Sequence, residues 1–168
     1  PLVFDNVHRI NDSYNKVECD SKYGTLFDKS RFTAVYAGGI SRERMTYQLA
    51  DAVGKLGPDF NLIIIGSARE EEKTYFRKYI EENEYRNVSY LGFISRAEFR
   101  YLLNRANVSI SAFSQETINN KFCASGKVYE SLFEGIPIMT TENPPLKRLC
   151  EEYGVGVRKE DTLLLESL

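Results

Sequence analysis

The sequence predicts an α/β fold: a doubly wound parallel sheet of about six strands with helices on both faces. Three observations predict it. Apolar, β-rich runs alternate with amphipathic helical segments along the chain. One run, FNLIIIG at 60–66, is apolar throughout, as is typical of a strand buried on both faces of a parallel sheet. The segments between runs are long enough to cross over as helices, and right-handed crossovers cover both faces.

The first half of the chain supplies three strands and two helices. Residues 32–39 (FTAVYAGG) are a β-rich run that two glycines end, and 42–57 has helical spacing until a Gly-Pro pair stops it. The buried strand at 60–66 comes next, and NVSYLGF at 87–93 is the third strand. Between them, 69–83 predicts a charged surface helix with these side chains pointing inward: Tyr75, Phe76, Tyr79 and Ile80.

The alternation continues through the second half. Ser95 and Glu98 are spaced as a capping box and predict the start of a helix over 95–106. The later elements are expected at 107–114 (strand), about 126–134 (helix), 136–141 (strand), 143–154 (helix), 155–157 (short strand) and 160–168 (the beginning of an apolar helix).

Composition excludes several classes of protein. The 168 residues, 42% of them hydrophobic, suffice for one packed domain. A net charge of −2 gives no basic field for nucleic acid, and the longest strongly apolar run, LIIIG, is too short to span a membrane. The single His8 and three widely spaced cysteines (Cys19, Cys123, Cys150) indicate neither a metal site nor a disulfide framework. We expect no metal.

The N-terminal segment differs from the rest. Residues 1–30 are polar and turn-rich without periodicity, so we expect an irregular linker there and the domain itself over 31–168. Because the chain begins at Pro1 rather than Met, we expect a piece of a longer protein. No signal-peptide pattern is visible, and we expect a cytoplasmic location.

Function is expected in the loops at one edge of the sheet, because doubly wound sheets bind ligands outside the carboxyl ends of their strands. The sequence SGKVYE offers the start of a helix, where free N–H groups and the helix dipole favour an anion. Ser125 can cap, Gly126 lets a ligand approach the backbone, and Lys127 adds charge on the same face as Glu130. The alternative is an ordinary capped helix with a Lys-Glu pair.

Two other loops carry weaker signals. Gly38 and Gly39 allow a tight turn and close approach to a diphosphate, with Arg44 just beyond to face phosphates or solvent. Phe93, after Gly92, is expected either beside a nucleobase or as a plug of the core. The spacing excludes a P-loop, and the lack of G-x-G-x-x-G disfavours an oxidoreductase.

The order of these pieces resembles the C-terminal nucleotide-sugar-binding half of a GT-B glycosyltransferase, of the retaining glycosyltransferase family 4 type. The resemblance covers about residues 31–158. VYAGGISRERMTYQLADAVGKL, NLIIIGSA and NVSYLGFISRAEFRYLLNRANVSISAF resemble successive family segments. SGKVYESLFEGIPIMTT is the most specific, because it resembles the family pattern K-L-x-E-Y-L-A-x-G-x-P-V-V-x-T.

The resemblance implies a Rossmann-like domain, roles for these residues and no metal. Glu130 matches the glutamate that binds the ribose hydroxyls. The helix start at Ser125, Gly126, Lys127 and Val128 matches the diphosphate cradle. Phe93 and Ile94 fall beside the base. Arg44 and Lys127 are the candidate catalytic cations, and Arg44 replaces a lysine that the family usually has.

Two positions depart from the family pattern. Gly39 stands where the family has a phosphate-binding arginine. Phe122 stands where the first glutamate of an E-x7-E motif would be, and Glu116 is out of register. These departures leave the transferred sugar open.

The implied activity is transfer of a sugar from a nucleotide-diphosphate sugar to a glycan or lipid-linked acceptor, as in polysaccharide biosynthesis. The acceptor would bind an N-terminal domain absent from this chain, so the chain alone should bind nucleotide weakly and transfer nothing. The full protein could also contact the inner face of the membrane peripherally. The alternatives are a GT-B-type sugar-nucleotide epimerase and a non-catalytic nucleotide-binding scaffold, the latter favoured by Gly39 and Phe122.

Overall fold

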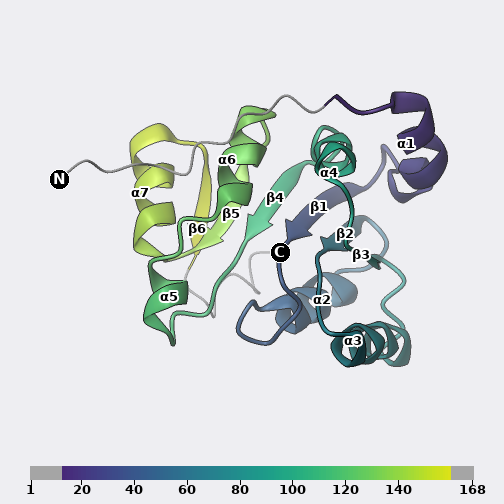
Figure 1. Ribbon diagram of the computed structural model, residues 1–168, viewed down its shortest axis with the longest axis horizontal. Helices are drawn as coiled ribbons and strands as arrows, with labels where there is room; N and C mark the ends of the chain where they lie inside the picture. The colour runs from purple at the N-terminus through teal and green to yellow at the C-terminus, as the bar shows by residue number, and fades with distance from the viewer. Residues whose placement is uncertain (1–12, 160–168) are drawn as a thin grey trace.

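The computed structural model describes residues 13–159, with side chains for 13–156. Helices and strands alternate along it (Figure 1). The strands are β1 (Phe32–Ala37), β2 (Phe60–Ile65), β3 (Val88–Gly92), β4 (Val108–Ser111), β5 (Ile138–Thr141) and β6 (Gly156–Lys159). The helices are α1 (Lys16–Tyr23), the 3-10 turn η1 (Gly24–Leu26), α2 (Thr46–Lys55), α3 (Glu70–Glu82), α4 (Arg96–Leu103), α5 (Ile118–Lys121), α6 (Gly126–Phe133) and α7 (Pro144–Tyr153).

The strands form one parallel sheet in the order β3-β2-β1-β4-β5, with the short strand β6 paired to β5 at the edge. The strand order reverses between β1 and β4, which makes that point the topological switch of a doubly wound sheet. The predicted α/β fold is confirmed. The carboxyl ends of all strands meet at the same edge, where such folds bind ligands.

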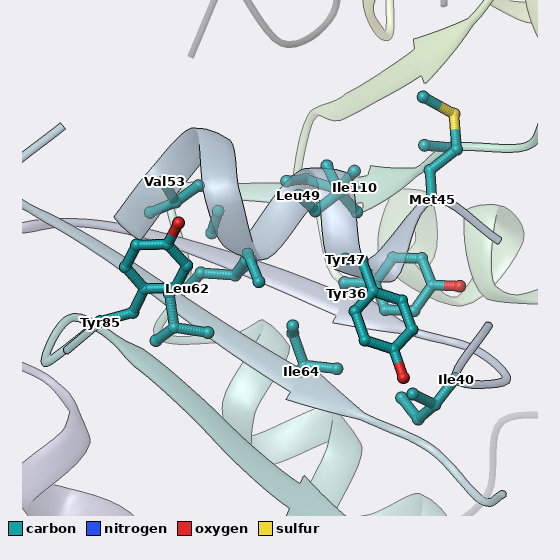
Figure 2. Packing of buried hydrophobic residues seen from close by; sticks show 14 of the residues in the cluster. Tyr36, Ile40, Met45, Tyr47, Leu49, Val53, Leu62, Ile64, Tyr85 and Ile110 are labelled. Carbon is teal, nitrogen blue, oxygen red and sulfur yellow. The ribbon is translucent and has the colours of Figure 1, made fainter. Parts of the chain in front are cut away.

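Successive residues of β2 are buried on opposite faces of the sheet. Leu62 and Ile64 of β2 pack in a cluster with α2 and α3, whereas Ile63 and Ile65 pack with α1 and α4. Figure 1 shows these helix pairs on opposite sides of the sheet, and Figure 2 shows the first cluster, in which Leu49 of α2 lies over the strands. A strand buried on both faces needs apolar side chains at every position, which is the reason for the uninterrupted FNLIII run.

The expectation of an irregular segment over residues 1–30 is wrong for 16–26, which form α1 and η1. The Asn15 side chain caps α1 by accepting hydrogen bonds from the amides of Val17 and Glu18 at 3.1 and 3.4 Å. Cys19 and Tyr23, one turn apart, are buried against α4. This segment therefore packs as part of the domain. Residues 1–12 and the helix expected at 160–168 lie outside the described residues.

None of the helices within residues 13–159 has the length and apolar character needed to cross a membrane.

Candidate functional site

A cavity of about 330 Å³ opens at the carboxyl edge of the sheet. It lies where the ends of β1 and β2, the loop after β3 and the first turns of α4 and α6 converge. The residues that line it are Ala37, Gly38, Ile65, Gly66, Ser67, Phe93, Ile94, Ser95, Arg96, Phe99, Lys127 and Glu130. We call this cavity the edge pocket.

Glu130 is the buried charge of the edge pocket, with 4% of its surface exposed. One carboxylate oxygen, Oε2, lies 3.0 Å from Lys127 Nζ of the same helix. The other, Oε1, lies 3.3 Å from Arg96 Nη2 at the start of α4. Because a buried carboxylate is costly unless it is paired, the two cations offset the cost of burying Glu130.

Lys127 connects the edge pocket to the beginning of α6. Its Nζ also lies 4.7 Å from the centroid of the Phe99 ring, so the ammonium is held over an aromatic face. The lysine projects into the pocket from the first turn of the helix, where backbone N–H groups lack partners within the helix. A side-chain cation and a helix N-terminus thus offer positive potential from the same place.

The other residues predicted for the site at the beginning of α6 differ in where they face. Ser125 is the N-cap residue but its hydroxyl makes no capping hydrogen bond, so it does not occupy the first-turn amides, one of which belongs to Gly126. Val128 faces the opposite way: its side chain packs in a cluster with Phe113 and α7, and its amide donates to Ser125 O at 3.1 Å. Val128 therefore supports the helix from the core and does not line the pocket.

The glycine turn after β1 forms the floor of the edge pocket. A Cβ atom added at Gly66 would lie 1.6 Å from the carbonyl oxygen of Gly38, so the two strand ends touch through backbone alone. The Tyr36 hydroxyl lies below and donates to the Gly39 carbonyl at 3.3 Å. Burial raises the pKa of Tyr36 well above its ordinary value, which keeps this donor protonated. Gly38 lines the pocket, whereas Gly39 lies beside it.

Arg44 lies outside the edge pocket. Its guanidinium carbon is 4.8 Å from the centroid of the Phe113 ring, at the end of β4, and its amide donates to Ser41 Oγ at 3.2 Å. The structure therefore brings Lys127 and Glu130 together but does not bring Arg44 into contact with them. Its assignment as a catalytic cation stays a prediction.

Phe93 and Ile94 line the mouth of the pocket after a turn at Gly92, whose φ of 75° favours glycine. Phe93 is 80% exposed, which rules out the alternative that it plugs the core. Ile94 packs in part against the α4 side of the core. An exposed aromatic ring beside a lined cavity is available to stack on a planar ligand.

Sequence reasoning missed Arg96 and Phe99 as pocket residues. The sequence predicts function in the loops that follow the strands, so Gly66 and Ser67 could be found by their place after a strand. Arg96 comes one residue after such a loop, and nothing in the linear sequence shows that it faces Glu130 from another helix.

At the departures from the family pattern, the structure shows Phe122 at the end of α5, 56% exposed and away from the lining of the edge pocket. Residues 13–159 contain no group of three or more His, Cys, Asp or Glu side chains placed to hold a metal ion.

Solved structures with this fold include nucleotide-binding proteins. Anabaena HepE in complex with UDP-glucose superposes with a TM-score of 0.70 at 16% identity, over 92% of this chain and 42% of that one. WaaG, a glycosyltransferase involved in lipopolysaccharide biosynthesis, gives 0.67 at 17% identity over 94% and 41%. The UDP-GlcNAc 2-epimerase from Neisseria meningitidis bound to UDP-GlcNAc gives 0.65 at 14% identity over 90% and 38%.

The chain spans about two fifths of the length of HepE and WaaG. No curated protein matches its sequence. The family model of glycosyl transferases group 1 matches residues 20–162, which is most of the chain and includes the second half of α1. The chain therefore belongs to the glycosyl transferases group 1 family.

Proposed function

We propose that this chain is the C-terminal, donor-binding domain of a retaining glycosyltransferase that takes a nucleotide-diphosphate sugar as donor. The observation that carries the proposal is the edge pocket, in which a buried carboxylate and a cation from the same helix turn lie together. The placement of the pocket at the switch point of the sheet supports a nucleotide ligand. HepE, which has this fold, is described in complex with UDP-glucose.

In this proposal, different residues of the site bind different parts of the ligand. Glu130 accepts hydrogen bonds from the ribose hydroxyls, and Phe93 and Ile94 border the base. The diphosphate lies against Gly38, Gly39 and the helix start at Ser125 and Gly126, with Val128 supporting that turn from the core. Lys127 neutralises the charge that develops on the diphosphate as the glycosidic bond breaks, and preorganised positive groups of this kind are a major source of catalysis.

Arg44 is proposed as a second cation for the leaving diphosphate, reaching it from the loop after β1. No metal is needed in this scheme, because the cations and amides of the chain supply the positive charge. A glycan or lipid-linked acceptor would bind a further, N-terminal domain. We propose that the whole protein acts in the cytoplasm in polysaccharide biosynthesis, with peripheral contact at the inner face of the membrane.

Calorimetric titration with UDP, UDP-glucose and uridine tests the site. Glu130→Gln should lower affinity for all three by about tenfold, the effect of losing one charge-assisted hydrogen bond. Lys127→Ala should lower affinity for UDP by about tenfold and affinity for uridine by less, because Lys127 faces the diphosphate in addition to pairing with Glu130.

Lys121→Ala is the matched control for charge, since Lys121 is a lysine on the neighbouring helix α5 and does not line the pocket. It should bind all three ligands as the parent does. Unchanged affinities in Glu130→Gln and Lys127→Ala, with both variants folded, would refute the proposed site.

A second candidate function is sugar-nucleotide epimerisation, because the Neisseria meningitidis UDP-GlcNAc 2-epimerase has the same fold. Product analysis of the full protein with UDP-GlcNAc separates the two: an altered sugar still attached to UDP indicates an epimerase, whereas sugar on an acceptor indicates a transferase. Binding without any turnover would favour a scaffold, in keeping with Gly39 and Phe122.

A further inference from the structure

Two arginine–glutamate pairs join α4 to α6, one turn apart on each helix. The inner pair, Arg100 Nε to Glu134 Oε1, is closed at 2.5 Å and lies away from the edge pocket. The outer pair, Arg96 Nη2 to Glu130 Oε1, is longer at 3.3 Å, and both partners line the pocket. The same pairing chemistry thus occurs once in the packing of the helices and once at the candidate site.

The outer pair is incomplete in a specific way. Nε and Nη2 of Arg96 are buried and neither makes a hydrogen bond, although Nη2 is within ion-pair distance of Glu130. Buried N–H groups without an acceptor are costly, and in native structures they usually indicate a missing partner. The inner pair shows that these helices can bring such groups to hydrogen-bonding distance, so helix packing alone does not explain the open arrangement.

The backbone that carries Arg96 is fixed. Ser95 caps α4: its hydroxyl accepts from the Glu98 amide at 3.2 Å, and its own amide donates to Glu98 Oε2 at 2.8 Å. Arg96 is the first residue of the helix. A planar guanidinium on a fixed backbone restricts the orientation of a carboxylate more strongly than a flexible lysine does.

We propose that Arg96 is a positioning residue for nucleoside recognition, and that it acts through Glu130. Lys127 of α6 pairs with Glu130 Oε2, and Arg96 of α4 pairs with Glu130 Oε1. Cations from two helices therefore fix the orientation of the carboxylate plane. The free lone pairs of Glu130 then face the two hydroxyls of the ribose. This inference rests on the proposed function, because it takes the ligand of the edge pocket to be a nucleotide.

The test compares two ligands that differ only in those hydroxyls: UDP and 2′,3′-dideoxy-UDP. Arg96→Met removes the guanidinium but keeps an unbranched side chain. It should lower affinity for UDP by about tenfold and affinity for the dideoxy ligand by less than about twofold. Arg96→Lys keeps the charge and loses the planar fork, so its UDP affinity should fall between those of Arg96→Met and the parent.

Arg100→Met is the matched control, because it opens the inner pair between the same two helices and should weaken both ligands equally or not at all. A merely structural role for Arg96 would give that same pattern. In a Glu130→Gln background, Arg96→Met should lower UDP affinity by less than about twofold, since the carboxylate it orients is gone.

Equal losses for the two ligands in Arg96→Met, or losses from Arg96→Met and Glu130→Gln that multiply, would overturn the inference. If Arg96→Met does not fold, as judged by circular dichroism, Arg96→Lys gives the same comparison between ligands. Loss of UDP affinity in Glu130→Gln with none in either Arg96 variant refutes the positioning role alone. No loss in Glu130→Gln refutes the proposed nucleotide site and this inference with it.

Discussion

In the candidate site, the backbone of Gly66 approaches the backbone of Gly38 closely. The Gly38 amide donates to Ile65 O at 2.9 Å, which extends the pairing of β1 with β2 by one residue beyond the strands. At that point the carbonyl of Gly38 occupies the space that a side chain at Gly66 would need. The floor of the edge pocket is therefore bare backbone, which lets a ligand approach its polar groups.

Gly66→Ala should consequently destabilise the fold. The added Cβ would lie 1.6 Å from the Gly38 carbonyl oxygen, so the ends of β1 and β2 must separate. Overpacking against backbone that cannot yield costs about 2 kcal/mol or more. Urea unfolding followed by circular dichroism measures this loss.

Gly39→Ala is the control for that substitution, because nothing lies within 4 Å of a Cβ added there. Its free energy of unfolding should stay within about 0.5 kcal/mol of the parent. Equal stabilities of Gly66→Ala and Gly39→Ala would show that the two strand ends do not meet as described.

At the scale of elements, Glu98 does two things at once: it completes the capping box of α4 and it anchors α1. Oε2 accepts from the Ser95 amide, while Oε1 accepts from Lys22 Nζ at 2.5 Å and from the Tyr23 hydroxyl at 2.7 Å. Burial alone would raise the pKa of Glu98, but these hydrogen bonds from Lys22, Tyr23 and Ser95 outweigh it and lower the pKa to about 2.

This predicts a pH-dependent contribution to stability. The folded pKa lies below the ordinary value of 4.5, so ionised Glu98 stabilises the fold above about pH 4.5 and loses this effect as the pH falls toward 2. Glu98→Gln should cost about 1 kcal/mol at neutral pH and progressively less in acid. Urea unfolding of parent and variant at neutral pH and at about pH 3 gives the comparison.

Glu82→Gln serves as the reference in that experiment, because Glu82 forms an exposed pair with Lys78 on α3. It should change stability little at either pH. A difference between parent and Glu98→Gln that stayed constant down to about pH 3 would contradict the assigned hydrogen bonds.

Periodicity predicted the helices that bury a wide apolar face and missed α1 and the short α5, which do not. On α3 it placed Phe76 correctly in the core, but Tyr75, also expected inward, is 55% exposed. On α1 only Cys19 and Tyr23 are buried, so no stripe shows in the sequence. The other contacts that hold α1 against the domain are hydrogen bonds and ion pairs with residues that are distant in sequence.

Those polar attachments explain why α1 could not be predicted from local sequence. Asp20 accepts hydrogen bonds from the Tyr101 hydroxyl and from Arg105 Nη1, each at 2.6 Å, and both donors come more than eighty residues later. The same reason hides Arg96 from sequence reasoning, since its importance depends on how α4 and α6 are placed. The order of the elements in the sequence predicts the edge of the sheet at which a ligand is expected, but not which side chains meet there.

For the molecule as a whole, the edge pocket joins the two halves of the sheet. Gly38 and Gly66 follow β1 and β2 in the first half, while Lys127 and Glu130 lie on α6, which packs on β4 and β5 in the second. Ser131 of α6 donates to Ser109 of β4 at 2.8 Å, which fixes the helix to the central strands. The pocket therefore exists only when both halves are folded together.

UDP should accordingly stabilise the entire domain. A ligand that binds only the folded state at about 100 times its Kd adds about 2.7 kcal/mol. For a domain of this size that corresponds to a rise in Tm of about 5–10 °C, within a single transition. Differential scanning calorimetry with and without UDP measures it, and Glu130→Gln at the same UDP concentration should show a smaller rise. Two separate transitions, only one of which moved with UDP, would place the ligand within one half of the sheet and contradict a site built from both.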